Sequence, residues 1–214
     1  MCGRFALDAT AENLTRQFEV EADKPITSRY NIAPSQLILT VTNQTQKRSL
    51  VAMKWGLVPN WVKNLDSWKG NLINARAETV AEKPSCKSAF KYRPCLIPVS
   101  GFYEWSSDKQ PYYFQQDSKL FALAGLWESW SNGNEELVSC TIITTKASKE
   151  AARIHHRSPV IIPASHYHLW LGEISARKQL LADLPEVDLQ IYPVSKVVNS
   201  PKNDTAECIE PIAA

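Results

Sequence analysis

The chain has 214 residues, of which 44% are hydrophobic and 21% are charged, which is typical of a globular domain with a hydrophobic core. Its 24 basic and 22 acidic side chains leave a net charge of +2. This balance excludes a general polycation and confines any nucleic-acid contact to a local patch.

Short helices and strands are predicted from the hydrophobic periodicity of the chain. In chain order we expect a helix at Ala9–Val20, strands at Leu37–Val41 and Ser49–Trp55, helices at Ala75–Glu82 and Cys86–Tyr92, strands at Cys95–Val99, Tyr112–Phe114, Leu120–Trp127 and Leu137–Thr144, helices at Lys146–Ile154 and Ala164–Leu171, and a last strand at Gln190–Val194. Runs of strands with helices between them indicate a single α+β domain over residues 1–214. We expect a mainly antiparallel, β-barrel-like core flanked by short helices.

The cysteines and the apolar runs limit the compartment and the cofactors. The five cysteines include no C-x-x-C pair and no histidine at zinc-ligand spacing, which argues against a disulfide framework and a metal site. No apolar run approaches the ~20 residues that span a bilayer, and neither a signal-peptide core nor a glycine-rich phosphate loop is present. We therefore expect a monomer of the cytoplasm, or of a nucleus, without a cofactor and without membrane contact.

Cys2 is the first candidate for chemistry, because it becomes the N-terminal residue once Met1 is removed. A free N-terminal cysteine has an amine of pKa ~7.7–8 and a thiol of pKa ~8.5 on adjacent carbons. Such a 1,2-aminothiol attacks an aldehyde to give an imine, and the thiol then closes a thiazolidine ring. The alternative is a cysteine that only happens to follow methionine. Gly3 and Arg4 favour the chemistry, because Gly3 frees the backbone and Arg4 adds a phosphate-seeking cation.

The segment 72–79 carries a second set of candidates. An apolar pair followed by Asn74, Arg76 and Glu78 predicts a strand that turns into a helix, with Asn74 near the N-cap. Asn74 could equally bind a ligand, and Arg76 could hold a phosphate. The alternative is a capping asparagine beside an Arg76–Glu78 surface pair.

Glu104 is flanked by Tyr103 and Trp105, shortly after the apolar strand at 95–99. A carboxyl group in such surroundings is desolvated, which raises its pKa and makes it a usable general acid or base. The alternative is a structural ion pair.

His155, His156 and Arg157 lie at an expected junction between helix and strand. They offer a proton carrier near neutral pH and a phosphate ligand. Because adjacent histidines in a helix point to different faces, we expect at most one of them to be catalytic. A pair of histidines without further ligands does not predict a metal site.

Seven segments, taken together, resemble the SRAP family, the abasic-site processing proteins first called SOS response-associated peptidases. The segments are Met1–Phe5, Tyr30–Pro34, Trp55–Pro59, Ile73–Thr79, Gly101–Trp105, Ile154–Pro159 and Val194–Ser195. Their order and spacing extend over nearly the whole chain, and this makes the resemblance specific.

The resemblance implies a β-barrel-like α+β domain with a positively charged groove for single-stranded DNA. It implies that Cys2 captures the aldehyde of a ring-opened abasic site as a thiazolidine, a covalent crosslink that shields the lesion. Asn74 then orients the opened sugar, Glu104 shuttles protons, and His155 assists ring opening and imine formation. The resemblance also implies DNA contacts, with phosphates held by arginines and bases stacked on tryptophans, at Arg4, Asn31, Pro34, Trp61, Arg76, Trp105 and Arg157.

Two other classes of function stay open. In a hydrolase with an N-terminal nucleophile, the free amine of Cys2 serves as the base for its own thiol. A peptidase that removes only Met1 is a related case, and intact mass with and without Glu104→Ala tests it. In a binding module for single strands, no covalent bond forms, so a complex that survives a denaturing gel excludes that class.

Overall fold

The computed structural model describes residues 2–22, 25–43, 47–117 and 120–212. Its elements are, in chain order, β1 (Phe5–Leu7), α1 (Ala11–Phe18), β2 (Arg29–Ile32), β3 (Leu37–Thr42), β4 (Ser49–Trp55), β5 (Asn74–Arg76), α2 (Lys87–Tyr92), β6 (Pro94–Val99), β7 (Gly101–Trp105), β8 (Pro111–Gln115), β9 (Phe121–Ser131), β10 (Glu136–Lys146), η1 (Ala151–Arg153), β11 (Arg157–Pro159), β12 (Ile161–Ile162), η2 (Ala164–His166), α3 (Tyr167–Leu171), α4 (Ile174–Ala182), β13 (Gln190–Pro193), η3 (Lys196–Asn199) and η4 (Ala206–Ile209). The η segments are short 3₁₀ helices.

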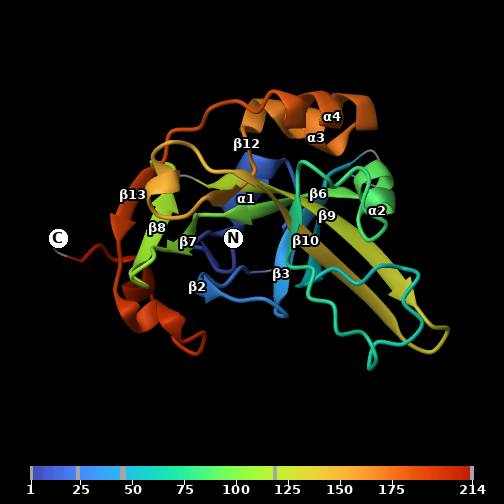
Figure 1. Ribbon diagram of the computed structural model, residues 1–214, viewed down its shortest axis with the longest axis horizontal. Coiled ribbons are helices and arrows are strands. Elements are labelled where there is room, and N and C mark those ends of the chain that lie inside the picture. Colours follow the sequence, from blue (N-terminus) through green and yellow to red (C-terminus); the bar gives the residue numbers. More distant parts are fainter. Residues whose placement is uncertain (1, 23–24, 44–46, 118–119, 213–214) are drawn as a thin grey trace.

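Strands β3, β4, β10, β9 and β6 close into a barrel (Figure 1). Each of them pairs with two neighbours in this ring, and only the β4–β10 pairing within it is parallel. Closure gives each of these strands a neighbour on both sides, although β4 covers only part of the edge of β10. The predicted α+β fold with a mainly antiparallel, barrel-like core is confirmed.

A second sheet has the strand order β13–β8–β7–β1–β2 and lies beside the barrel in Figure 1. One hydrophobic core joins the two, because Phe5 of β1 packs on Trp55 of β4 with ring centroids 5.2 Å apart. Gly101 begins β7, and a Cβ atom there would lie 2.2 Å from the ring of Tyr113. Only glycine therefore lets β7 and β8 approach this closely.

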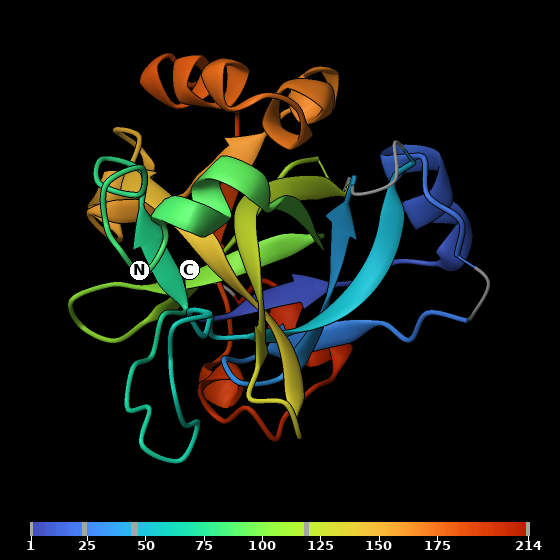
Figure 2. The same cartoon turned by 90° about the vertical axis from the view of Figure 1, so that its right-hand side faces the viewer.

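The helices cover the outside of the sheets. Figure 2 shows α3 and α4 along the top of the molecule, with the C-terminal segment at the opposite end. Trp170 of α3 donates its indole N–H to the carbonyl oxygen of Cys95 in β6 at 2.8 Å. The predicted helix at Ala9–Val20 is confirmed as the shorter α1, which begins at a Thr10 capping box and buries Leu14 and Phe18.

The predicted helix at Ala75–Glu82 is wrong. Residues Asn74–Arg76 form strand β5, which pairs in parallel with β10, and turns follow it. β4 pairs with β10 only at Ser139 and Cys140, so the edge of β10 beyond these residues is open for β5. This tertiary pairing overrides the local helix signal, and Asn74 is a strand residue rather than an N-cap.

The predicted helix at Lys146–Ile154 is also mostly wrong, because only Ala151–Arg153 is helical and Lys146 ends β10, opposite Arg157 of β11. The sequence prediction did not include β1, β2, β7, β11, β12 or α4. All five cysteines lie within the described residues, and each is buried and free. No helix in the described part of the chain has the length and apolar character to cross a membrane.

Candidate functional site

Cys2 lies three residues before the start of β1 and is fully buried. The side-chain amide nitrogen of Asn74 donates a hydrogen bond of 2.8 Å to the carbonyl oxygen of Cys2. Burial raises the pKa of the Cys2 thiol far above its ordinary value, and the negative charge of Glu104 raises it further. The thiol is therefore protonated at neutral pH and needs a base to react.

Pairing between strands explains why these residues meet. β1 pairs with β7 so that Phe5 lies opposite Phe102, and the N–H of Tyr103 donates to the carbonyl oxygen of Arg4 at 3.0 Å. This pairing brings Glu104 of β7 to the start of the chain. β10 supplies the other side of the site, because it pairs with β5, which carries Asn74, and with β11, which His155 precedes.

Glu104 is buried, and its carboxylate oxygen lies 3.8 Å from Nδ1 of His155. Burial raises the pKa of Glu104 to about 7. The expected effect of desolvation on this carboxyl group is confirmed, and such a group exchanges protons efficiently at neutral pH.

His155 lies in the site, whereas His156 lies on the surface. The rings are 4.5 Å apart, but only His155 approaches Glu104, and Nδ1 of His155 also meets the backbone N–H of Arg157 at 3.1 Å. His156 is exposed, and the nearby charge of His155 lowers its pKa. The structure thus brings together all four predicted catalytic residues, Cys2, Asn74, Glu104 and His155.

The carbonyl oxygen of the Asn74 side chain is buried and has no hydrogen-bond partner among the described residues. A buried acceptor without a partner is costly. It is therefore suited to a hydroxyl or amine donor of a ligand held against Cys2.

The three predicted phosphate-binding arginines have different surroundings. The guanidinium of Arg157 is paired with both carboxylate oxygens of Glu78, one of them at 3.0 Å, and donates to the carbonyl oxygen of Thr144 at 2.7 Å. Arg4 is held by Asn31 at 2.6 Å. Arg76 is exposed.

The other predicted DNA contacts divide between two places. Asn31 is fully buried, and Trp105 lies near Arg4, with the guanidinium 5.9 Å from the centre of its ring. Pro34 is half-buried in the turn after β2. Trp61 lies in the loop between β4 and β5, is 55% exposed and meets Trp68 edge-on at 5.6 Å.

Sequence reasoning missed two acidic residues of this region. It offered Glu78 only as a surface partner of Arg76, whereas Glu78 pairs with Arg157, and the hydrogen bonds from Arg157 lower the pKa of Glu78. It did not name Asp204, which accepts the backbone N–H of Asn31 at 2.9 Å. Neither pairing has a signal in local spacing, because the partners are 79 and 173 residues apart. Among the described residues, no group of histidine, cysteine and acidic side chains is placed to hold a metal ion.

A cavity of about 500 Å³ lies away from this cluster, between α1 and the start of α3. Asp8, Arg16 and Tyr167 contribute to its lining, and it includes none of the predicted site residues. The candidate site is therefore defined by the side chains around Cys2 rather than by this cavity.

Comparison with known proteins gives the following similarities. The family model described as SOS response associated peptidase (SRAP) matches residues 1–201. The abasic site processing protein YoqW of Bacillus subtilis (strain 168) is 39% identical, over 98% of this chain and 99% of its own length. The abasic site processing protein HMCES of Xenopus tropicalis is 36% identical, over 78% of this chain and 59% of its own length. A crystal structure of a protein from Bacteroides thetaiotaomicron has the same fold, with a TM-score of 0.86 and 22% identity over 99% of this chain and 100% of that one.

Proposed function

The chain belongs to the SRAP family, and from this membership we propose that it processes abasic sites in DNA by forming a covalent bond between Cys2 and the opened sugar. Relatives named abasic site processing proteins support the substrate class. The observation that carries the proposal is the meeting of Cys2 with Asn74, Glu104 and His155 at the start of the chain.

The proposed reaction begins with removal of Met1, which releases the α-amine of Cys2. This amine attacks the aldehyde carbon of the ring-opened abasic sugar, and loss of one water gives an imine. The thiol of Cys2 then adds to the imine carbon, and its proton passes to the ring nitrogen. The product is a thiazolidine. Removal of Met1 consumes one water and releases methionine, the capture of the aldehyde releases one water, and no step needs an oxidant or reductant.

Glu104 is the proposed proton carrier for these steps. A carboxyl group with a pKa of about 7 donates a proton to the departing water and accepts one from the thiol as it attacks. Such a base is needed because the buried thiol of Cys2 is protonated at neutral pH. His155, 3.8 Å from Glu104, relays protons between the carboxyl group and solvent or the opening sugar.

The proposed DNA contacts place phosphates on Arg4, Arg76 and Arg157. Planar guanidinium groups suit phosphate oxygens. The buried oxygen of Asn74 is the proposed acceptor for a sugar hydroxyl. Stacking on Trp61 and Trp105 favours unpaired bases, so single-stranded DNA is the proposed form of the substrate.

The test combines purified protein with a single-stranded oligonucleotide that carries one abasic site, followed by a denaturing gel. We expect a shifted band for the wild type and none for Cys2→Ala. Cys2→Ser keeps the amine but lacks the thiol, so it should give a band only after borohydride reduction of the imine. Cys86→Ala removes a buried thiol elsewhere and should crosslink like the wild type. A stable band from Cys2→Ala would overturn the proposal.

The same samples distinguish the two other classes of function, the hydrolase and the non-covalent binding module. A wild type that loses Met1 but forms no band favours a hydrolase with an N-terminal nucleophile. A wild type that binds the oligonucleotide in a native gel but never in a denaturing gel favours a non-covalent binding module.

A further inference from the structure

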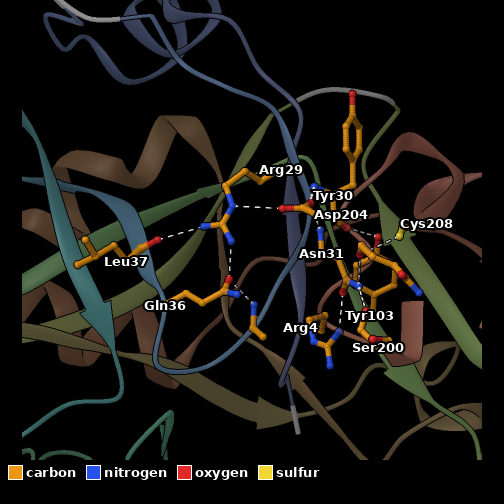
Figure 3. A network of polar contacts seen from close by, with 12 residues as sticks. Arg4, Arg29, Tyr30, Asn31, Gln36, Leu37, Tyr103, Ser200, Asp204 and Cys208 are labelled. Carbon is orange, nitrogen blue, oxygen red and sulfur yellow. Dashed lines mark hydrogen bonds and ion pairs between the residues drawn. The ribbon is translucent and has the colours of Figure 1, made fainter. Parts of the chain in front are cut away.

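The C-terminal segment 196–204 is fastened to the start of the chain by a network of polar contacts (Figure 3). One carboxylate oxygen of Asp204 accepts the backbone N–H groups of both Tyr30 and Asn31, and the other lies 3.4 Å from Nε of Arg29. β2, which contains these three residues, is the edge strand of its sheet. Asp204 therefore satisfies N–H groups that an edge strand leaves without a partner.

Asn31 continues the network from β2 into the segment. Its amide nitrogen donates to the carbonyl oxygens of Val198, Ser200 and Asn203 at 3.1, 3.0 and 2.6 Å. Its amide oxygen accepts from Nη1 of Arg4 at 2.6 Å. Asn31 is fully buried, and both the nitrogen and the oxygen of its side-chain amide form hydrogen bonds within the protein.

Hydrogen bonds to this segment position the side chains of Arg4 and Trp105. Nη1 of Arg4 also donates to the carbonyl oxygen of Val198 at 2.9 Å, and the indole N–H of Trp105 donates to the side-chain oxygen of Asn199 at 2.8 Å. Arg4 is two residues from Cys2. A displacement of residues 198–204 therefore moves a cation and an aromatic ring near the reactive terminus.

We propose that Asp204 and Asn31 are positioning residues, which hold segment 196–204 in place so that Arg4 and Trp105 are fixed for DNA beside Cys2. The proposal rests on the proposed function for the role of Arg4 as a phosphate contact. It assigns Asn31 a place behind the binding surface rather than on it. Asp204 lies beyond the residues 1–201 that the family model matches, so this part of the site is supplied from outside that stretch.

The first test needs no DNA and compares Asp204→Ala with Glu210→Ala by hydrogen exchange. Glu210 is exposed in the same terminal region, so its removal changes the charge equally. We expect faster exchange at residues 196–203 in Asp204→Ala alone, because the segment has lost its anchor. Equal exchange in the two variants would overturn the proposal.

The second test measures affinity for an undamaged single-stranded oligonucleotide by fluorescence anisotropy. We expect Asp204→Ala to weaken binding by about threefold to tenfold, as for residues coupled in one network. In an Arg4→Ala background the same change should weaken binding by a smaller factor, because Asp204 acts in part through Arg4. Independent, multiplying losses would contradict the positioning role.

Asp204→Asn is the rescue variant, because its amide oxygen still accepts the two backbone N–H groups. Asp204→Asn should bind the oligonucleotide more tightly than Asp204→Ala does. If Asp204→Ala does not fold, Asp204→Asn replaces it in the comparison with and without Arg4→Ala. A wild type that binds undamaged DNA but never crosslinks would overturn the proposed function alone. A wild type that binds no single-stranded DNA would overturn both proposals.

Discussion

The side-chain amide of Asn74 is hydrogen-bonded to the main-chain carbonyl of Cys2, with nitrogen and oxygen 2.8 Å apart across 72 residues of sequence. This contact fixes the start of the chain against β5. The other end of the same amide is a buried oxygen without a partner among the described residues. In the proposed reaction, Asn74 thus holds Cys2 on one side and offers an acceptor to the sugar on the other.

Asn74→Ala is expected to slow crosslinking to abasic single-stranded DNA by about tenfold, because it removes a hydrogen bond that orients the nucleophile. Single-turnover kinetics on a denaturing gel measure the rate at saturating DNA. Asn134→Ala, in the exposed turn between β9 and β10, is the matched control and should keep the wild-type rate. Equal rates for Asn74→Ala and the control would contradict the assigned role.

Glu104 predicts a specific dependence of stability on pH. Burial raises its pKa from an ordinary 4.5 to about 7, so the folded state holds the proton more tightly than the unfolded state does. The contribution of protonated Glu104 to the free energy of unfolding is fully present below pH 4.5. It is lost as the pH rises through 7, and the loss is on the order of 3 kcal/mol. Glu104→Gln cannot ionise and should lack this loss.

Urea unfolding of both proteins between pH 5 and pH 8 measures this difference, because the linkage acts on the free energy of unfolding. The advantage of Glu104→Gln over the wild type should increase with pH across this range. A constant difference between the two proteins would show that Glu104 keeps an ordinary pKa in the folded state.

Arg76 is an exposed residue of β5, the strand that carries Asn74, and we expect it to hold one phosphate. Arg76→Ala should then weaken binding to single-stranded DNA and reduce the slope of log K against log salt by about 0.7, the value for one phosphate contact on a single strand. Anisotropy titrations at several salt concentrations give the slope. Arg16→Ala, on the exposed side of α1, should leave it unchanged.

The barrel core can be tested by replacing leucine with alanine at one buried position, Leu96, and at one exposed position, Leu37. Leu96 in β6 is 0% exposed and Leu37 in β3 is 64% exposed. Leu96→Ala should lower the free energy of unfolding by about 2–5 kcal/mol through lost burial and a cavity, and Leu37→Ala by less than about 0.5 kcal/mol. Chemical denaturation measures the free energy of unfolding of both variants. Similar losses of stability in the two would contradict the assignment of Leu96 to the core.

Hydrophobic patterning was sufficient to predict much of the sheet. β3, β4, β9 and β10 are apolar and rich in β-branched or aromatic residues, so each has a strand signal of its own. β5 has no such signal, because Asn74–Arg76 becomes a strand only through pairing with β10. β1, β2 and β7 are short strands whose pairing depends on residues far along the chain, and no local pattern contains that information.

The candidate site could be predicted as a set of residues but not as an arrangement. The chemistry of Cys2, the desolvation of Glu104 between aromatic residues and the choice of His155 follow from local sequence and the family resemblance. The pairing of Arg157 with Glu78 and the anchoring role of Asp204 depend on contacts between distant strands and loops. Such contacts become visible only in the folded chain.

Intact mass spectrometry of the purified complex tests whether Cys2 captures an abasic sugar covalently. We expect a mass equal to the protein without Met1 plus the oligonucleotide, less one water, with the modification located at Cys2 after digestion. A protein that lacks Met1 and yet gives no adduct, or an adduct located at another residue, would contradict it.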